Sequence, residues 1–294
     1  MRPSTLRSFR SKLFVPGARP DLFDKALAGA ADALSFDLED AVLPEAKAAA
    51  REAVAALLAR ASAMDKPPLI IVRVNAPGTS WFDDDLRAVV RPGLDWINLP
   101  KACSADEVRH AAHRIDALEA GARLAAPVGL LVNIESAAAL HRAAEIGAAH
   151  PRVAGLQLGL ADLYEPLGIE RRDPANVHAT QHALRLAAAV AGVAAYDGAF
   201  PDVGDAEGFR AEARAARRLG FAGKSCIHPR QVAPANEVFG PDAGALAWAA
   251  RVDAAAREAE AAGRGVVLLD GQMIDPPFIQ RARQLLHASR GVSA

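Results

Sequence analysis

Residues 127–164 read PVGLLVNIESAAALHRAAEIGAAHPRVAGLQLGLADLY, and the rest of the chain can be arranged around this stretch. Two apolar runs, Val128–Ile134 and Val153–Leu158, flank an alanine-rich segment from Ser136 to Ile146 that has the pattern of a helix. A strand, a helix and a strand in this order form one right-handed crossover between neighbouring parallel strands. The stretch therefore predicts a parallel α/β architecture.

An acidic residue follows each of the two apolar runs. Glu135 comes directly after the first, and Asp162 follows the second within a Gly-Leu-Ala-Asp-Leu turn. If the strands are parallel neighbours, both carboxylates emerge at the same edge of the sheet. Either acid alone could be a helix cap or a partner of the helix dipole. Together they are oxygen ligands suited to a hard divalent cation, and Mg²⁺ is the ion that we expect.

Composition excludes several classes of protein. With 294 residues and 51% hydrophobic composition, the chain can bury a large core. The net charge is −1, so nothing indicates a nucleic-acid-binding surface. No apolar run approaches the roughly 20 residues that span a bilayer. Cys103 and Cys226 lie far apart without a metal-binding motif, as in a reduced cytosolic protein. We expect a cytoplasmic protein without nucleic-acid or membrane partners.

The first ten residues contain Arg2, Arg7 and Arg10 among serines, which resembles the composition of a transit peptide. Because a predicted strand follows at once, we do not expect a targeting signal here.

Short apolar runs alternate with helical patterns along most of the chain. The runs are mostly continuous rather than alternating, as in parallel strands that are buried on both faces. Eight such alternations within about 240 residues predict a (β/α)₈ TIM barrel. A doubly wound open sheet is the alternative, but no Gly-x-Gly-x-x-Gly follows the first run. The runs are Lys12–Val15, Ala33–Leu38, Leu69–Val74, Trp96–Leu99, Val128–Ile134, Val153–Leu158, Val193–Tyr196 and Gly223–Ile227.

Helix signals support this division. Ser104-Ala-Asp-Glu107 is a capping box for a helix that we expect Gly121 to end, and residues 205–219 form a helix before Gly220. We expect the barrel to occupy residues 1–240 and a helical extension to occupy residues 241–294.

The extension has its own pattern, with a helix over Pro241–Ala262, an extended piece over Val266–Ile274 and a last helix over Pro276–Ser289. It exceeds what a barrel needs, so we expect a lid, an oligomer contact or both.

Polar residues gather at the carboxyl ends of the predicted strands, where TIM barrels build their active sites. Along the chain they are Arg19 and Lys25, then Asp37, Glu39 and Asp40, then Arg73, Lys101, Glu135, Asp162, Asp197 and His228.

Several of these residues also have a structural interpretation. Arg73 could form an ion pair with Asp37 or Glu39, and Asp197 could shape a tight turn. For Lys101 a solvated loop residue is the favoured interpretation, and for His228 it is a helix cap. The acids would repel one another unless a metal ion and Arg73 neutralised them.

Seven motifs, in order and over nearly the whole chain, resemble those of the citrate lyase β-subunit-like (CitE-like) acyl-CoA lyases of the HpcH/HpaI aldolase superfamily. The motifs are RSKLFVPGARP at residues 10–20, DLEDAV at 37–42, RVN at 73–75, LPK at 99–101, IES at 134–136, GLAD at 159–162 and GKSCIHP at 223–229.

The resemblance implies a (β/α)₈ barrel, usually trimeric, that holds Mg²⁺ through the acids matching Glu135 and Asp162. It implies a carbon–carbon lyase that cleaves a β-hydroxyacyl-CoA of the malyl, citramalyl or citryl type to acetyl-CoA and a 2-oxo acid.

The same resemblance assigns roles to other residues. Glu135 would contact the substrate as well as the metal. Arg73 would contact the reacting carbonyl, Phe14, Arg19 and Lys25 would hold the CoA end, and Glu39 and Asp40 would hydrogen-bond the waters on magnesium.

The tail carries a further resemblance. Residues 270–275, DGQMID, resemble the lid motif of malyl-CoA and citramalyl-CoA lyases, in which the aspartate matching Asp275 enters the active site of a neighbouring subunit. Asp275 would then be the acid that protonates the thioester enolate, and the protein would be a homo-oligomer, a trimer or a hexamer. Without the resemblance, Asp275 would be an ordinary helix cap.

Other functions stay open on the sequence. The same site could act as a malate synthase or an acyl-CoA thioesterase. It could be a CoA-independent 2-oxo acid aldolase, although Arg19 and Lys25 would then have no phosphate to meet. A metal-dependent binding protein without catalysis is a third alternative, for which no residue argues. The candidate acyl groups differ by small substituents, and the sequence does not discriminate among them.

Overall fold

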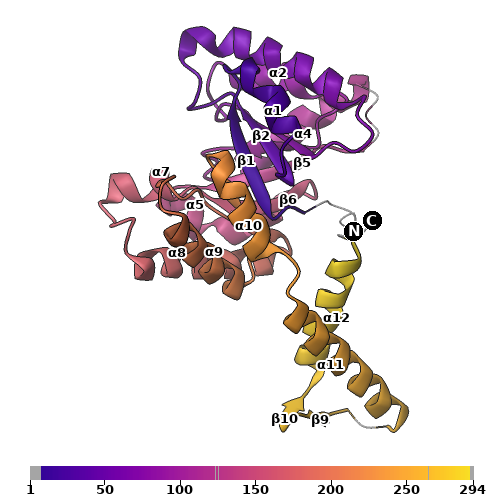
Figure 1. Cartoon of the computed structure of the whole chain (residues 1–294). Coiled ribbons are helices and arrows are strands. Elements are labelled where there is room, and N and C mark those ends of the chain that lie inside the picture. The colour runs from indigo at the N-terminus through magenta and orange to yellow at the C-terminus, as the bar shows by residue number, and fades with distance from the viewer. Residues whose placement is uncertain (1–7, 123, 125, 264, 292–294) are drawn as a thin grey trace. The chain divides into compact units, whose positions relative to one another are not determined.

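The computed structural model describes residues 8–122, 124, 126–263 and 265–291, so Arg2 and Arg7 lie outside the described part. The chain divides into two compact units, of which the first ends at Phe239 and the second begins at Gly240 (Figure 1). We describe each unit separately. Within the described residues, no helix is long and apolar enough to cross a membrane.

The first unit is a closed barrel of eight parallel strands. The strands pair in chain order, and β8 pairs with β1 to close the sheet. The predicted TIM barrel is therefore confirmed, with every strand within two residues of its expected bounds. The strands are β1 Ser11–Pro16, β2 Ala33–Asp37, β3 Leu69–Arg73, β4 Trp96–Leu99, β5 Gly129–Ile134, β6 Val153–Leu158, β7 Ala194–Asp197 and β8 Gly223–Cys226.

Helices connect the strands and surround them (Figure 1). The α-helices are α1 Phe23–Leu27, α2 Lys47–Ala61, α3 Phe82–Val89, α4 Ala105–Ala122, α5 Ala137–His141, α6 Ala143–Ala148, α7 Leu160–Tyr164, α8 Pro174–Ala191, α9 Ala206–Leu219 and α10 Val232–Phe239. Short 3₁₀ turns cover Pro20–Leu22 (η1), Pro44–Ala46 (η2), Glu165–Leu167 (η3) and Pro229–Gln231 (η4).

Two helix predictions need correction. The segment predicted as one helix from Ser136 to Ile146 is two helices, α5 and α6, separated at Arg142. Helix α4 does not end at Gly121 but continues to Ala122. By contrast, α9 ends as expected at Gly220, which has a φ of 91°.

The capping box at the start of α4 is only half formed. Ser104 Oγ accepts a hydrogen bond from the Glu107 N–H at 3.2 Å. The Glu107 carboxylate accepts from the Cys103 N–H at 2.6 Å and not from Ser104 as a full box requires.

The barrel interior is layered along the strands. Eight buried side chains form an apolar floor, in which the Phe9 and Tyr196 rings stack with centroids 3.9 Å apart. Side chains alternate between the two faces of a strand, so residues two positions further on point into the same interior. Three polar residues each lie two positions after a floor residue on the same strand: Asn98 after Trp96, Asn133 after Leu131 and Arg73 after Ile71. A polar layer therefore lies next to the apolar floor, toward the carboxyl ends of the strands. The floor residues are Phe9, Ala33, Leu69, Ile71, Trp96, Leu131, Ala154 and Tyr196.

Asp197 does not have the predicted role at a tight turn. Its carboxylate is fully buried and pairs with Lys224, whose Nζ also contacts Glu212 of α9 at 2.8 Å. Gln181 of α8 donates a hydrogen bond to Asp197 Oδ1 at 3.0 Å. Because its partners come from α8 and α9, Asp197 faces the helices and not the site. His228 is a cap, as expected, because its Nδ1 accepts from the Arg230 N–H.

The second unit packs two helices, α11 Ala243–Ala261 and α12 Pro276–Gly291, against each other around Ala249, Val252, Ile274 and Ala282. Between them the expected extended piece is a hairpin of β9 Val267–Leu269 and β10 Gln272–Ile274. Its turn residues Asp270 and Gly271 have positive φ values of 52° and 78°, which an Asp-Gly pair tolerates.

The closure of the barrel generates a prediction about stability. A Cβ on Gly223 would overlap the Phe9 carbonyl oxygen and lie 2.8 Å from that of Arg10. Gly223→Ala should therefore lower the free energy of unfolding by about 1–3 kcal/mol, as overpacking does. Gly121→Ala in α4 is the matched control, since no atom lies within 4 Å of its added Cβ. It should be neutral or stabilise by up to about 1 kcal/mol. Urea unfolding measures both, and equal stabilities would contradict the close approach.

Candidate active site

Glu135 directly follows β5 and is held by two hydrogen bonds. The Lys101 N–H donates to Glu135 Oε1 at 2.5 Å, and Asn133 Nδ2 donates to Oε2 at 3.0 Å. Ser136, not Glu135, caps the following helix, because its Oγ accepts from the Ala139 N–H. The capping interpretation of Glu135 is therefore wrong, and its buried carboxylate is available for another role.

Asp162 lies in the first turn of α7, and β6 and β5 bring it to the same edge of the barrel as Glu135. Gly159 permits this approach, since a Cβ there would lie 2.5 Å from Glu135 Oε2. The pKa of Glu135 is raised to about 7, mainly by burial and also by the charges of Glu39 and Asp162, while the Lys101 N–H and the charge of Arg73 act in the opposite direction. Asp162 is exposed and close enough to act on Glu135 electrostatically.

Arg73, at the end of β3, is bound on two sides by acids. Its Nε and Nη2 donate to the two Asp37 oxygens at 2.7 and 2.6 Å, and its Nη1 lies 3.0 Å from Glu39. Although burial opposes it, Arg73 lowers the pKa of Asp37 below its usual range. Burial raises the pKa of Glu39 in spite of its ion pairs. The structural ion pair considered for Arg73 is present, and the guanidinium is thereby fixed in one orientation.

Lys101 is an exposed loop residue, as the sequence favoured, but it also forms ion pairs that the sequence did not predict. Its Nζ lies 2.9 Å from Glu39 and 3.1 Å from Asp40, while its backbone N–H holds Glu135. Its φ of 54° is unusual for a residue with a side chain. Lys101 therefore connects the loop after β2 to the loop after β5, a role that depends on contacts between distant parts of the sequence.

The three residues expected at the CoA end lie along β1 and the segment after it. The Phe14 ring lies 5.1 Å from the Arg73 guanidinium carbon, which places it beside the polar cluster. Arg19 is exposed and pairs with Asp21 at 2.7 Å, and Lys25 is exposed on α1. The structure thus provides two exposed cations in the connection between β1 and β2.

Beneath the site lie buried polar side chains that were not predicted from the sequence. Lys12 Nζ donates to Asn98 Oδ1 at 2.9 Å, and Asn98 Nδ2 donates to Asn133 Oδ1 at 2.8 Å. Gln157 Nε2 also donates to Asn133 Oδ1, at 3.0 Å. The available signal was a polar residue inside an otherwise apolar strand, as Asn98 is in Trp96–Leu99.

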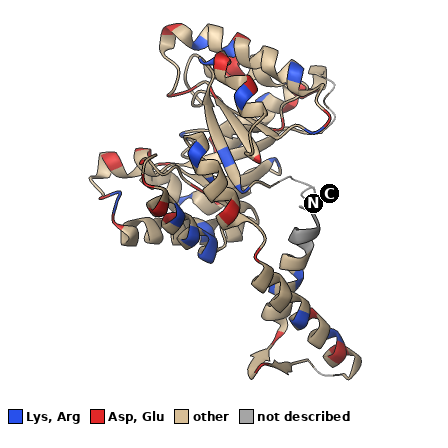
Figure 2. Cartoon of the chain, viewed as in Figure 1, with Lys and Arg blue, Asp and Glu red and all other residues tan. Residues whose placement is uncertain are grey.

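The donor set suits a hard cation with few protein ligands. In the described part of the chain, no three His, Cys, Asp or Glu side chains are grouped as a metal site. An ion at this edge would therefore use the carboxylates of Glu135 and Asp162 and complete its coordination with other oxygen atoms. Figure 2 shows that acidic and basic residues are mixed along the helices. The grouping of acids at the carboxyl ends of the strands is therefore a local feature of the molecule.

Asp275 belongs to the second unit, at the start of α12. Its backbone oxygen accepts from the Phe278 and Ile279 N–H groups, whereas its Oδ1 is buried and has no hydrogen-bond partner among the described residues.

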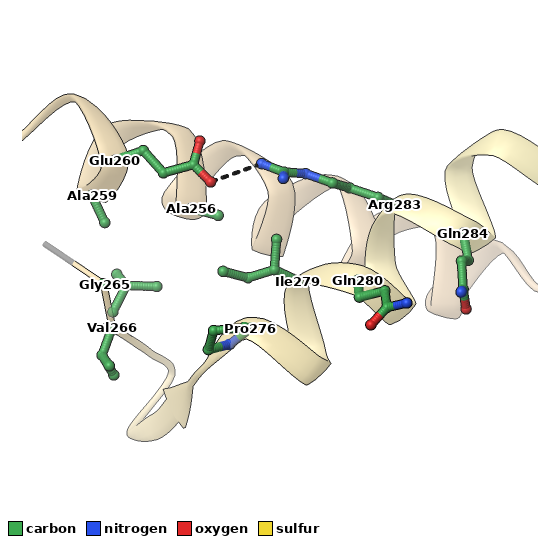
Figure 3. Close-up of a pocket in the computed structure, with 11 residues that line it drawn as sticks. Ala256, Ala259, Glu260, Gly265, Val266, Pro276, Ile279, Gln280, Arg283 and Gln284 are labelled. Carbon is green, nitrogen blue, oxygen red and sulfur yellow. Dashed lines mark hydrogen bonds and ion pairs between the residues drawn. The ribbon is translucent and has the colours of Figure 1, made fainter.

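A hollow of about 750 Å³ lies within this unit, between α11, β9 and α12 (Figure 3). Its walls are mostly apolar, and the ion pair of Arg283 with Glu260 at 3.1 Å crosses one side. It contains no cluster of reactive groups, so the barrel edge is the better candidate for catalysis.

Comparisons with known proteins agree with the geometry. Residues 10–229 match the family model described as HpcH/HpaI aldolase/citrate lyase. The chain is 35% identical to the L-malyl-CoA/β-methylmalyl-CoA lyase of Cereibacter sphaeroides, over 99% of this chain and 98% of that protein. It is 38% identical to a (3S)-malyl-CoA thioesterase of the same species, over 97% of this chain and 96% of that protein.

Solved structures lead to the same family. A crystal structure of the protein CitE from Mycobacterium tuberculosis, in complex with magnesium, acetoacetate and coenzyme A, superposes with a TM-score of 0.76. Its sequence is 34% identical, and the match covers 96% of this chain and 98% of that one. The expected family and enzyme class are confirmed: the chain is a carbon–carbon lyase by class and belongs to the HpcH/HpaI aldolase/citrate lyase family.

Proposed function

We propose that the chain is a Mg²⁺-dependent lyase that cleaves a β-hydroxyacyl-CoA of the malyl, citramalyl or citryl type to acetyl-CoA and a 2-oxo acid. The observation that carries this proposal is the convergence of Glu135, Asp162 and Arg73 at the carboxyl edge of a barrel of this family. A lyase among the relatives and a neighbour solved with magnesium and coenzyme A support it.

Glu135 and Asp162 would hold the ion, and Glu39 and Asp40 would hydrogen-bond its waters. A bound Mg²⁺ supplies Lewis-acid polarisation of the substrate oxygens and a template for their orientation. The charge of the site fits such an ion, because nearby carboxylates raise the pKa of Glu135 and a divalent cation would offset their repulsion.

Arg73 would stabilise the oxygen that becomes negative when the carbon–carbon bond breaks. In that step the substrate hydroxyl loses its proton and becomes the 2-oxo group of the acid that is released, and the electrons of the broken carbon–carbon bond move into the thioester enolate. A guanidinium has five N–H donors, of which Asp37 takes two, while Nη1 forms an ion pair with Glu39 at 3.0 Å. Arg73 therefore keeps donors for an enolate oxygen while its orientation is fixed.

Phe14, Arg19 and Lys25 would hold the CoA end of the substrate. Arg19 and Lys25 are exposed cations on one connection of the barrel, which suits the phosphates of CoA. A CoA-independent aldolase would have no use for these two cations.

Asp275 would return a proton to the enolate carbon and complete acetyl-CoA. Its Oδ1 makes no hydrogen bond among the described residues, so the fold of the second unit does not use that oxygen. We place Asp275 in the site of a neighbouring subunit of a trimer or hexamer, as the lid motif implies.

A thioesterase is the second candidate, since a relative of that name is 38% identical over nearly the whole chain. In that reaction water attacks the thioester carbonyl, and the same Mg²⁺ ligands and Arg73 could serve it.

A panel of malyl-, methylmalyl-, citramalyl- and citryl-CoA, assayed with and without Mg²⁺, tests the proposal. We expect a 2-oxo acid and a shortened acyl-CoA only with Mg²⁺ for the lyase, namely acetyl-CoA or, from methylmalyl-CoA, propionyl-CoA, and we expect free CoA for the thioesterase. Glu135→Ala should lower turnover by about 100-fold or more. Glu145→Ala, an exposed glutamate on α6, should leave it unchanged. Mg²⁺-dependent turnover that persists in Glu135→Ala would contradict the metal assignment.

The raised pKa of Glu135 predicts a pH-dependent stability in the presence of a chelator. Between pH 4.5, the ordinary value, and about 7, the folded protein keeps a proton on Glu135 that the unfolded chain has lost. The free energy of unfolding must therefore fall as pH rises through this window. Glu135→Gln is neutral in both states and should melt roughly 2–4 °C above the wild type at pH 8, with a smaller difference at pH 5.

Mg²⁺ supplies the control for this experiment. Adding it at pH 8 should raise the melting temperature of the wild type and not that of Glu135→Gln. A difference between the two proteins that does not change with pH would rule out the shifted pKa as its cause.

Asp275→Asn should lower turnover by about 10² to 10⁴, because it removes the proton carrier and keeps the size of the side chain. Asp270→Asn, in the turn of the hairpin that precedes Asp275, is the control and should retain activity, since asparagine tolerates its positive φ. Turnover of Asp275→Asn within a factor of two of the wild type would exclude it as the acid.

Co-expression tests whether Asp275 acts on a neighbouring subunit. Chains carrying Asp275→Asn and chains carrying Glu135→Ala are each expected to be inactive alone. Mixed oligomers should recover part of the activity, because some sites then combine an intact Glu135 with an intact Asp275. No recovery in verified mixed oligomers would place both residues in one chain.

A further inference from the structure

Lys12 is a buried amine that the proposed chemistry does not use. Its side chain, on β1, is fully buried in the polar layer of the barrel, and its Nζ lies 4.0 Å from the centre of the Phe14 ring. In the described part of the chain, no carboxylate lies within ion-pair distance of it. Lys224, the other fully buried lysine of the strands, pairs with two carboxylates. Lys12 therefore calls for an explanation other than charge pairing.

Three hydrogen bonds connect Lys12 to Glu135. Lys12 Nζ donates to Asn98 Oδ1 at 2.9 Å, Asn98 Nδ2 donates to Asn133 Oδ1 at 2.8 Å, and Asn133 Nδ2 donates to Glu135 Oε2 at 3.0 Å. The four side chains come from β1, β4, β5 and the residue after β5, and all are buried. We call this chain of hydrogen bonds the relay.

The direction of the relay is fixed by groups that can only accept. Asn98 Nδ2 also donates to the Leu131 carbonyl at 3.0 Å, so its Oδ1 must point to Lys12. Asn133 Oδ1 accepts from Asn98 Nδ2 and Gln157 Nε2, so the Nδ2 group of Asn133 must point to Glu135. Each amide therefore has one orientation, and turning either one would place donor against donor or acceptor against acceptor.

We propose that Lys12 is a positioning residue that, through Asn98 and Asn133, holds the Glu135 carboxylate in the orientation in which it takes a divalent cation. The cation itself rests on the function proposed above. Glu135 Oε1 accepts from the Lys101 N–H and Oε2 accepts from Asn133, so the carboxylate cannot rotate without losing a hydrogen bond. Each oxygen keeps a lone pair for a metal ion.

The role of Lys12 does not require a charge. Burial and the charge of Arg73 lower the pKa of Lys12 well below its usual range. A neutral amine still donates, so the hydrogen bond to Asn98 is kept in either form. Without that donor the buried Asn98 Oδ1 would have no hydrogen-bond partner, and the relay would lose its first hydrogen bond.

The test compares Mn²⁺ binding to full-length variants by electron paramagnetic resonance of the free ion. Lys12→Met removes the donor and keeps the length of the side chain. Asn98→Asp still accepts from Lys12 but cannot donate to Asn133. Ser225→Ala is the matched control, since Ser225 pairs in register with Lys12 on β8 and its Oγ has no hydrogen-bond partner among the described residues.

We expect Mn²⁺ to bind about 10-fold more weakly to both Lys12→Met and Asn98→Asp than to the wild type, as when outer partners of metal ligands are removed. Ser225→Ala should bind like the wild type. Wild-type affinity in Lys12→Met, or an equal loss in Ser225→Ala, would overturn the proposal. The second variant keeps the test decisive if Lys12→Met does not fold.

Crystal structures of the wild type and Lys12→Met separate this proposal from the one on which it rests. If the wild type binds no Mn²⁺, the metal assignment fails and the crystal structures alone decide the relay. A Glu135 carboxylate that turns in Lys12→Met supports the relay, and an unmoved carboxylate with both amides in place overturns it.

Discussion

The carboxyl edge of the barrel gathers more negative charge than its own cations offset, and this imbalance constrains the rest of the site. The five acids Asp37, Glu39, Asp40, Glu135 and Asp162 outnumber the nearby cations Arg73, Lys101 and Lys47. Arg73 and Lys101 neutralise the acids after β2, but Glu135 has only neutral hydrogen-bond donors. Its raised pKa is the physical result, and a divalent cation is the chemical group that would relieve it.

The layered interior of the barrel explains how this charge is supported. Aromatic and aliphatic side chains fill the floor, amides and Lys12 occupy the next layer, and charged groups lie at the edge. Because strand side chains alternate with a period of two, each step of two residues moves one layer toward the edge. Leu131, Asn133 and Glu135 show the sequence of layers on a single strand and its exit. Asp37 and Arg73 thus lie on rigid strands, whereas Glu39, Asp40 and Lys101 lie on loops and Asp162 lies on α7.

The second unit is held together by its own contacts and not by the barrel strands. Its helices enclose a small core of their own, and the hairpin between them ends in the turn at Asp270 and Gly271. Asp275 follows this hairpin and precedes α12, so its position depends on that small unit and not on the barrel strands. The proton donor that we propose at Asp275 would thus belong to a different unit from the metal ligands that we propose at Glu135 and Asp162.

The sequence by itself determined the barrel, the order of its strands and most of the acids at its edge. Apolar runs and turn residues are local signals, and in a parallel barrel every strand ends at the same edge, so Glu135 and Arg73 could be placed from position alone. The division of residues 136–146 into two helices was missed, because the break at Arg142 carries no glycine or proline. The carboxylates and Arg73 were also easier to interpret once the family motifs were recognised.

Only the tertiary structure decided which side chains meet. Lys101 pairs with Asp40 across 61 residues, and Lys12 reaches Asn98 across 86. Asp197, at a strand end like the others, turns out to face the helices and pairs with Lys224. Whether a strand residue points into the barrel or toward its helices depends on the register of neighbouring strands, and closure of the sheet fixes that register. The local sequence does not reveal this register, because the residues that pair are brought together by the fold and not by their spacing along the chain.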